Sequence, residues 1–224
     1  MKADQPTLPR ILVLASGSGT NFQALIDASR ERDFPGQIIA LGCNQPKAFA
    51  LERAAQANVE TFVVNHKDFG SRDEFDAALM AHILRHNPDL IVLAGFMRIL
   101  TTDFVRAFRG KLVNIHPSLL PLYTGLNTHQ RALDAGDQTH GVSIHFVTEE
   151  LDGGPVIAQA EVAVTAEDTA QTLAEKVQKK EHLLYPIVVR WFCEGRIQLR
   201  HEQALFDGEP LNAPMCLPDS QDAP

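Results

Sequence analysis

The stretch 11-ILVLASGSGTNFQALIDASR-30 contains a strand, a glycine-rich turn and a helix in succession. Residues 11–16 are apolar without alternation, which is typical of a strand that is buried on both faces. The turn follows at 16–21, and the helical pattern then runs from Asn21 to about Arg30. This order predicts the first βα unit of a parallel sheet.

The same alternation continues through the first half of the chain. Strands are predicted at 37–44, 60–65, 90–95 and 112–116, and helices at Lys47 to about 57, 72–86 and near 127–135. Right-handed βαβ units of this kind build a mainly parallel sheet with helices on both faces.

The C-terminal half predicts an antiparallel addition to that sheet. Residues 140–147 alternate, 155–164 are extended, and the turn 151-LDGGP-155 joins them as a hairpin. A long helix over about Thr169–Cys193 and a short strand near 197–200 follow, and then a polar tail from about 205 to 224. We therefore expect an α/β, Rossmann-like, three-layer fold: a single domain over 1–224, with residues 1–9 as an N-terminal extension.

Composition excludes several classes of protein. The 224 residues are 45% hydrophobic and carry a formal charge of −8, so a broad nucleic-acid surface is not expected. The spacing of Cys43, Cys193 and Cys216 fits neither a zinc site nor a disulfide framework. The N-terminus has no apolar signal core and no run is long enough for a membrane span, so a cytoplasmic protein is expected.

The turn 16-SGSGTN-21 is a candidate phosphate-binding loop, because glycines allow close backbone approach and the following helix offers free N–H groups. It lacks the lysine motif of NTPase loops, and Phe22 stands at the third glycine position of the dinucleotide fingerprint. A single phosphate group is the ligand that remains. The alternative is a tight βα turn in which Thr20 or Asn21 caps the helix.

The stretch 112-LVNIHPSLLP-121 places two polar side chains on a short apolar strand. Asn114 and His116 share one face, because side chains alternate along a strand. Pro117 ends the strand, so both side chains lie at its carboxyl end, where open parallel sheets bind ligands. The alternative is a pair of satisfied structural polar groups.

Asp152 and three further histidines leave alternatives open. Asp152 could hold and charge a histidine, or it could serve the Asp-Gly turn alone. His129, His140 and His145 could join His116 in a metal site, but their spacing lacks a recognised metal-ligand pattern, so no metal is expected.

Five segments together resemble the folate-dependent phosphoribosylglycinamide formyltransferases, members of the formyltransferase superfamily. They are 16-SGSGTN-21, 95-GFMRIL-100, 114-NIHPSLLP-121, 140-HGVSIHFVTEELDGGPVI-157 and 178-QKKEH-182. The resemblance extends from about Arg10 to the tail, and the loop 122-LYTGLNTH-129 departs from the family pattern.

The resemblance implies an enzyme of purine synthesis that moves a formyl group from 10-formyltetrahydrofolate to the amine of 5-phosphoribosylglycinamide. The sequence leaves open whether the protein is a monomer or a homodimer. The resemblance also implies the catalytic trio Asn114, His116 and Asp152. The implied contacts to the phosphoribosylglycinamide are Gly19, Thr20, Asn21, Arg72 and Glu181. The implied folate contacts are Met97, Arg98, Ile99, Leu100, Asn114, Thr148, Glu149, Glu150, Leu151 and Asp152.

Three alternatives remain beside this one. A methionyl-tRNA formyltransferase would carry an added tRNA-binding domain, and a formyltetrahydrofolate hydrolase would carry an extra N-terminal regulatory domain. A non-catalytic phosphoribosyl-binding module would not require the trio.

Overall fold

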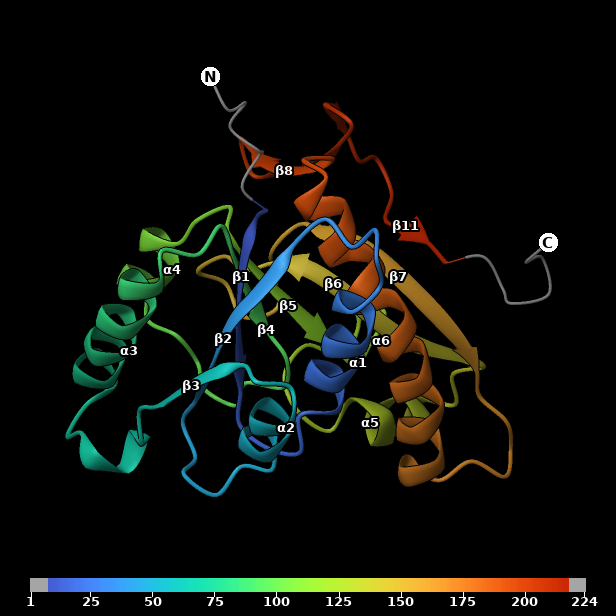
Figure 1. Ribbon diagram of the computed structural model, residues 1–224. Helices are drawn as coiled ribbons and strands as arrows, with labels where there is room; N and C mark the ends of the chain where they lie inside the picture. Colours follow the sequence, from blue (N-terminus) through green and yellow to red (C-terminus); the bar gives the residue numbers. More distant parts are fainter. Residues whose placement is uncertain (1–7, 218–224) are drawn as a thin grey trace.

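The computed structural model describes residues 8–217 and has a three-layer α/β architecture (Figure 1). An eight-stranded central sheet has the strand order β11-β7-β6-β5-β4-β1-β2-β3. Its strands are β1 (Arg10–Ala15), β2 (Gln37–Cys43), β3 (Glu60–Val63), β4 (Leu90–Leu93), β5 (Leu112–His116), β6 (Thr139–Phe146), β7 (Val156–Ala163) and β11 (Met215–Cys216). The expected Rossmann-like fold is confirmed.

The direction of the strands agrees with the expected mainly parallel sheet. Strands β1 to β5 are mutually parallel, whereas β6 runs antiparallel to both β5 and β7. The chain passes from β1 outward to β2 and β3, and β4 then pairs on the other side of β1. This reversal creates a crevice at the carboxyl ends of β1 and β4, where ligands of such sheets bind.

Helices cover both faces of the sheet. They are α1 (Thr20–Ser29), α2 (Ala50–Gln56), α3 (Arg72–His86), α4 (Thr102–Ala107), α5 (Thr128–Ala135) and α6 (Ala170–Cys193), with a 3-10 turn η1 at His66–Asp68. Figure 1 shows α1 and α6 side by side on one face, with α3 and α4 on the opposite face. Strand β1 contributes to both layers, since Ile11 and Val13 pack in one core and Leu12 and Leu14 in the other.

The long helix α6 is fixed at its beginning and along its length. Thr169 and Thr172 form a capping box at its N-terminus. The hydroxyl of Tyr185, which is fully buried, donates to the carbonyl of Leu93 at 3.0 Å. Helix α6 is therefore anchored to the end of β4, close to the ligand edge.

Two helices differ from the sequence predictions. Helix α2 begins at Ala50 rather than at Lys47, because the Ala50 N–H donates to the Gly17 carbonyl and residues 47–49 form a turn against the glycine-rich loop. The short helix α4 had no counterpart among the predicted elements, and the Thr101 hydroxyl caps it by accepting from the N–H of Phe104.

The C-terminal segment is more structured than a polar tail. Strands β8 (Ile197–Arg200), β9 (Gln203–Phe206) and β10 (Glu209–Pro210) form a separate three-stranded sheet, and β11 joins the central sheet beside β7. The prediction of a tail from 205 is therefore wrong as far as 217, because backbone pairing and the contact of Phe206 with Trp191 order this segment. Residues 1–7 of the predicted extension and 218–224 of the predicted tail lie outside the described residues.

Candidate active site

Strands β5 and β6 together present four polar side chains on one face of the sheet. Their register pairs Asn114 with His145 and His116 with Ser143. Directly paired residues of antiparallel strands point to the same side. The strand-end polar pair predicted from the sequence is thus part of a larger polar cluster that only the β5–β6 register creates.

Asp152 reaches His116. Its Oδ2 lies 3.4 Å from Nδ1 of the imidazole, and the two side chains are only 9% and 7% exposed. The other ring nitrogen, Nε2, donates to the carbonyl oxygen of Tyr123 at 2.9 Å. Because a carbonyl can only accept, Nε2 carries a proton and Nδ1 is the atom that faces the carboxylate.

The backbone around Asp152 aims its carboxylate. Asp152 has φ 51°, a left-handed conformation that asparagine and aspartate adopt more readily than most residues. The Gly125 N–H donates to its Oδ2 at 2.8 Å. Two residues on, a Cβ at Gly154 would overlap the carbonyl of Phe146, so this turn can lie flat against β6 only with glycine there. The conformation of the LDGGP turn therefore also determines where the Asp152 carboxylate lies.

His145 orients the Asn114 amide. The imidazole is 2% exposed, and burial lowers its pKa, which favours the neutral ring. Its Nδ1–H donates to the Phe146 carbonyl at 2.9 Å, so Nε2 is left to accept from Nδ2 of Asn114 at 3.1 Å. This contact fixes the NH₂ end of the amide at His145 and leaves its second N–H for another acceptor. From the sequence, His145 was a candidate for a metal ligand only, because the alternation of residues 140–147 predicts which face the side chain lies on but not which residue it contacts.

The glycine-rich loop lies between β1 and α1, as predicted, and Gly19 is its critical residue. Gly19 has φ 70° and is the N-cap of α1, with no side chain capping the helix. The alternative in which Thr20 or Asn21 caps α1 is therefore wrong. A Cβ at Gly19 would lie 2.7 Å from Cβ of Ala50, so the close approach of α2 also requires glycine.

Helix α6 completes the loop's surroundings. Asn21 Nδ2 donates to Glu181 at 2.8 Å, and Gln178 donates to the Thr20 hydroxyl at 3.2 Å. Burial raises the pKa of Glu181. The structure thus brings together Gly19, Thr20, Asn21 and Glu181, four of the five residues predicted to contact the phosphoribosylglycinamide.

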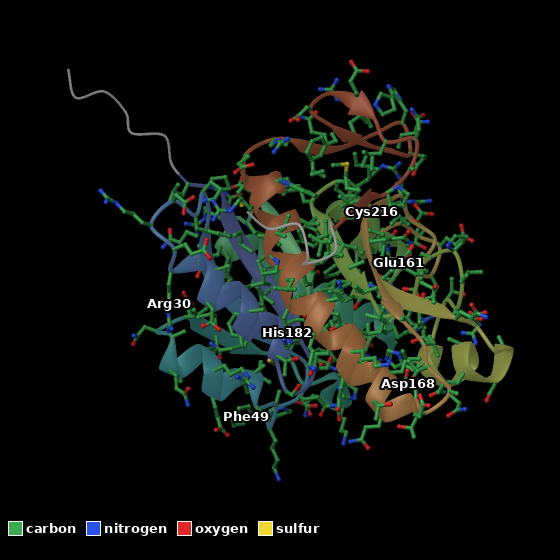
Figure 2. All side chains as sticks on the ribbon, turned by 90° about the vertical axis from the view of Figure 1, so that its right-hand side faces the viewer. Arg30, Phe49, Glu161, Asp168, His182 and Cys216 are labelled. Atoms are coloured by element: carbon green, nitrogen blue, oxygen red, sulfur yellow. The ribbon has the colours of Figure 1, made fainter. Side chains whose placement is uncertain are left out.

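Two cationic or polar side chains beside this loop were not singled out from the sequence. Arg53 of α2 donates to the Ser18 carbonyl at 2.8 Å, and His182 of α6 has a buried Nε2 without a partner among the described residues. Figure 2 labels His182 on the face of α6 turned to the viewer. Thr20, Arg53 and His182 are among the residues that line an open groove of about 670 Å³ between α1 and α6. Thr20, Arg53 and His182 lie on three different helices, so their proximity depends on the packing of α1, α2 and α6 and has no local signal in the sequence.

The predicted folate segment 97–100 adjoins the loop on the other side. The Met97 N–H donates to the Ser16 hydroxyl at 2.7 Å. Met97 and Ile99 are 69% and 57% exposed, so they form an apolar rim. The segment ends at Thr101, whose N–H donates to the buried carboxylate of Asp76 at 2.6 Å.

Arg72 and Arg98 both lie around this Asp76 carboxylate. Burial raises the pKa of Asp76, while the positive charges of the two arginines oppose that rise. Arg72, for which the resemblance implies a contact with the nucleotide, therefore lies near the end of the predicted folate segment. The Arg98 guanidinium also lies 5.8 Å from the centre of the Phe75 ring.

In the loop 148–152, one residue forms an ion pair with a neighbouring helix, whereas others are exposed to solvent. Glu149 forms a two-pronged ion pair with Arg106 of α4, at 2.6 and 3.2 Å. Leu151 is 54% exposed, Glu150 is exposed and Thr148 is half-buried. The loop therefore offers apolar surface near Asp152 while one of its carboxylates is already engaged.

Neither a metal cluster nor a membrane helix is found in the described part of the chain. Within residues 8–217, no three histidine, cysteine or acidic side chains are grouped so that they could hold a metal ion. Over the same residues, no helix combines the length and apolar character that crossing a membrane requires. His129 and His140, considered above as metal ligands, bond to each other at 3.1 Å.

Comparison with known proteins gives the family. The formyl transferase family model matches residues 9–189. The phosphoribosylglycinamide formyltransferase of Escherichia coli K12 is 49% identical over 201 residues, which are 90% of this chain and 95% of that protein. A solved phosphoribosylglycinamide formyltransferase from Coxiella burnetii, in complex with CHES, superimposes with a TM-score of 0.90 at 46% identity, covering 95% of this chain and 100% of that one.

A second solved structure agrees. Glycinamide ribonucleotide transformylase 1 from Symbiobacterium toebii has a TM-score of 0.86 at 39% identity, over 90% of this chain and 95% of that one. The resemblance inferred from the five sequence segments is thus confirmed: this chain belongs to the formyl transferase family, and the relatives that it matches over nearly their whole length are phosphoribosylglycinamide formyltransferases.

Proposed function

We propose that this protein transfers the formyl group of 10-formyltetrahydrofolate to the amine of 5-phosphoribosylglycinamide, a step of de novo purine biosynthesis. The observation that carries the proposal is the contact between His116 and Asp152, beside Asn114, at the ligand edge of the sheet. The names of the relatives matched over nearly their full length support the same activity.

The proposed chemistry is direct transfer through a tetrahedral intermediate. The glycinamide amine attacks the formyl carbon, and the oxygen of the formyl group becomes an oxyanion. The amide of Asn114, whose NH₂ end His145 orients, donates to that oxygen. One such preorganised donor typically lowers a barrier by about 3–4 kcal/mol.

Proton transfer completes the exchange. The attacking nitrogen must lose one proton, and the departing folate nitrogen must gain one. His116 can accept and return a proton at Nδ1, and the adjacent Asp152 carboxylate stabilises the imidazolium between those events. Neither step requires a covalent intermediate on the enzyme.

The glycine-rich loop is the proposed site for the phosphate of the nucleotide. Its Gly19 and the first turn of α1 offer backbone N–H groups, and Arg53 supplies a positive charge beside them. Asn21 and Glu181 form a hydrogen-bonded pair that suits hydroxyl or amine groups of the ribosyl-glycinamide part. Thr20 lies between these two regions.

The folate is proposed to bind against the apolar rim. Met97, Ile99 and Leu151 expose apolar side chains, as a flat ring system requires. Arg98, Leu100 and the rest of 148–152 extend this surface, and Arg72 lies at its side. A cytoplasmic location and a monomeric or homodimeric state remain predictions.

The competing function is hydrolysis of formyltetrahydrofolate, which would use the same trio with water in place of the amine. The two are separated by incubating the protein with 10-formyltetrahydrofolate and following folate absorbance with and without the glycinamide nucleotide. Turnover that requires the nucleotide supports the proposal, turnover without it supports the hydrolase, and nucleotide binding without turnover indicates a binding module.

A further inference from the structure

The loop at 121–127 contacts the trio with its backbone. The Tyr123 carbonyl accepts from Nε2 of His116 at 2.9 Å, and the Gly125 N–H donates to the Asp152 carboxylate at 2.8 Å. The Leu122 carbonyl, in turn, accepts from the hydroxyl of Ser118 at 2.6 Å. Backbone atoms of this one loop thus fix both members of the histidine–carboxylate pair.

Tyr123 holds its place in the loop through its side chain. It has φ 55°, a left-handed conformation that is unfavourable for an aromatic residue, so other contacts must fix it. Its hydroxyl donates to Oδ2 of Asp137 at 2.5 Å. The Arg131 guanidinium lies 5.3 Å from the centre of the ring and also donates to the Thr124 carbonyl at 2.6 Å.

Asp137, the anchor of the Tyr123 hydroxyl, lies at the end of α5 and is not part of the trio. Asp137 follows the C-terminus of α5, and its own N–H donates to the Ala132 carbonyl at 3.2 Å. The Tyr123 ring also meets His140 edge-on at 6.2 Å. The phenol–carboxylate bond therefore ties the loop to the end of α5, and the ring contact with His140 ties it to β6.

We infer that Tyr123 is a positioning residue: its bond to Asp137 holds its carbonyl against Nε2 of His116, so that Nδ1 is the nitrogen turned to Asp152. Without that acceptor, a neutral imidazole could carry its proton on either nitrogen, and the ring could rotate. The charged or titratable side chains near His116 are Asp152, His129, His140 and His145. Of these four residues, Asp152 is the only carboxylate, so the orientation of the His116 ring decides which of its nitrogens faces that carboxylate.

The inference deepens the proposed function and rests on it for its catalytic meaning. Tyr123→Phe removes a single oxygen atom from a half-buried side chain. We expect kcat for formyl transfer to fall about tenfold, as for other slight misplacements of catalytic groups, while KM for both substrates is unchanged. Asp137→Ala should give the same loss, and the double variant should lose no more than either single one.

A matched control lies on the same segment. Asp134 is exposed on α5, where it accepts from Gln130, and Asp134→Ala removes a carboxylate just before the anchor without touching the loop. This variant should keep the kcat of the parent protein.

The decisive readout is the tautomer of His116, measured by nitrogen NMR of isotopically labelled histidine in the protein without substrates. The parent protein should show neutral His116 protonated at Nε2, and Tyr123→Phe should show a mixture of both tautomers. An unchanged tautomer in Tyr123→Phe overturns the inference even if kcat falls, and so does an unchanged kcat. Because the NMR measurement needs no turnover, it tests the anchor even if the proposed formyl transfer fails.

Discussion

The carboxylate of Asp152 bridges His116 and Gly125. Its Oδ2 lies 3.4 Å from the imidazole Nδ1 and accepts the Gly125 N–H at 2.8 Å. The turn after β6 and the loop after β5 are thereby joined at one oxygen atom. This geometry allows one carboxylate to stabilise an imidazolium and to hold the loop that follows β5.

Replacing either member of this pair should slow turnover without weakening binding. We expect His116→Ala and Asp152→Asn each to lower kcat more than about tenfold, because general acid–base catalysis contributes at least this factor, while KM stays close to the parent value. His201→Ala and Asp73→Asn, both at exposed positions, are matched controls that should leave kcat unchanged. Steady-state kinetics with both substrates provides the check, and near-parent turnover in either test variant would remove the pair from the mechanism.

Removing the Asn114 amide should have a larger effect. Asn114→Ala takes away the donor for the oxyanion, and loss of one such donor typically costs about 10²–10³ in kcat. The exposed Asn212 provides the comparison, as Asn212→Ala should behave like the parent protein. A drop in kcat of less than about tenfold would show that another group stabilises the oxyanion.

The glycine-rich loop can be tested with two alanines. Gly19→Ala places a Cβ 2.7 Å from Cβ of Ala50 in a backbone with φ 70°, a conformation that costs a non-glycine residue roughly 1–2 kcal/mol. We expect KM for the glycinamide nucleotide to rise while KM for the folate changes little. Gly70→Ala is the control, since its Cβ would meet only the Glu74 carboxylate at 3.4 Å. Equal KM values for the nucleotide in both variants would contradict a phosphate role for the loop.

The buried His140 should make the free energy of unfolding depend on pH. Burial lowers its pKa from 6.5 to about 4, so the native state binds fewer protons than the unfolded state between those values. The stabilisation from the neutral ring is complete above pH 6.5 and is lost as the pH falls toward 4. The free energy of unfolding should therefore decrease less between neutral and acidic pH in His140→Gln than in the parent protein. Urea denaturation at several pH values measures this difference, and parallel curves would be inconsistent with a buried neutral His140.

Much of the fold could be predicted because its signals are local. Unbroken apolar runs marked β1 and β4, Ser71 capped α3 and Asn87 ended it, and the LDGGP turn marked the β6–β7 hairpin. The two-residue strand β11 could not be found in this way, because it is held by pairing with the distant strand β7. Strand β10 pairs with the preceding β9 across the Asp207-Gly208 turn, a local hairpin signal that the predicted tail overlooked.

The candidate site was predictable only in part. Asn114 and His116 could be placed together, since residues two apart on a strand share a face. The approach of Asp152 and the role of His145 depend on the register between β5 and β6, which no local pattern specifies. Arg53 and His182 joined the loop only through helix packing, and Tyr123 acts through a carbonyl that has no signature in the sequence.

Direct formyl transfer is tested most directly by following the formyl carbon itself. The protein is incubated with 10-formyltetrahydrofolate carrying an isotopically labelled formyl carbon and with 5-phosphoribosylglycinamide, and the products are analysed by mass spectrometry. The account predicts that the label appears in the formylated glycinamide nucleotide in equal amount to the tetrahydrofolate released, and that His116→Ala forms this product more slowly. Label recovered as free formate, or release of tetrahydrofolate without the nucleotide, would contradict it.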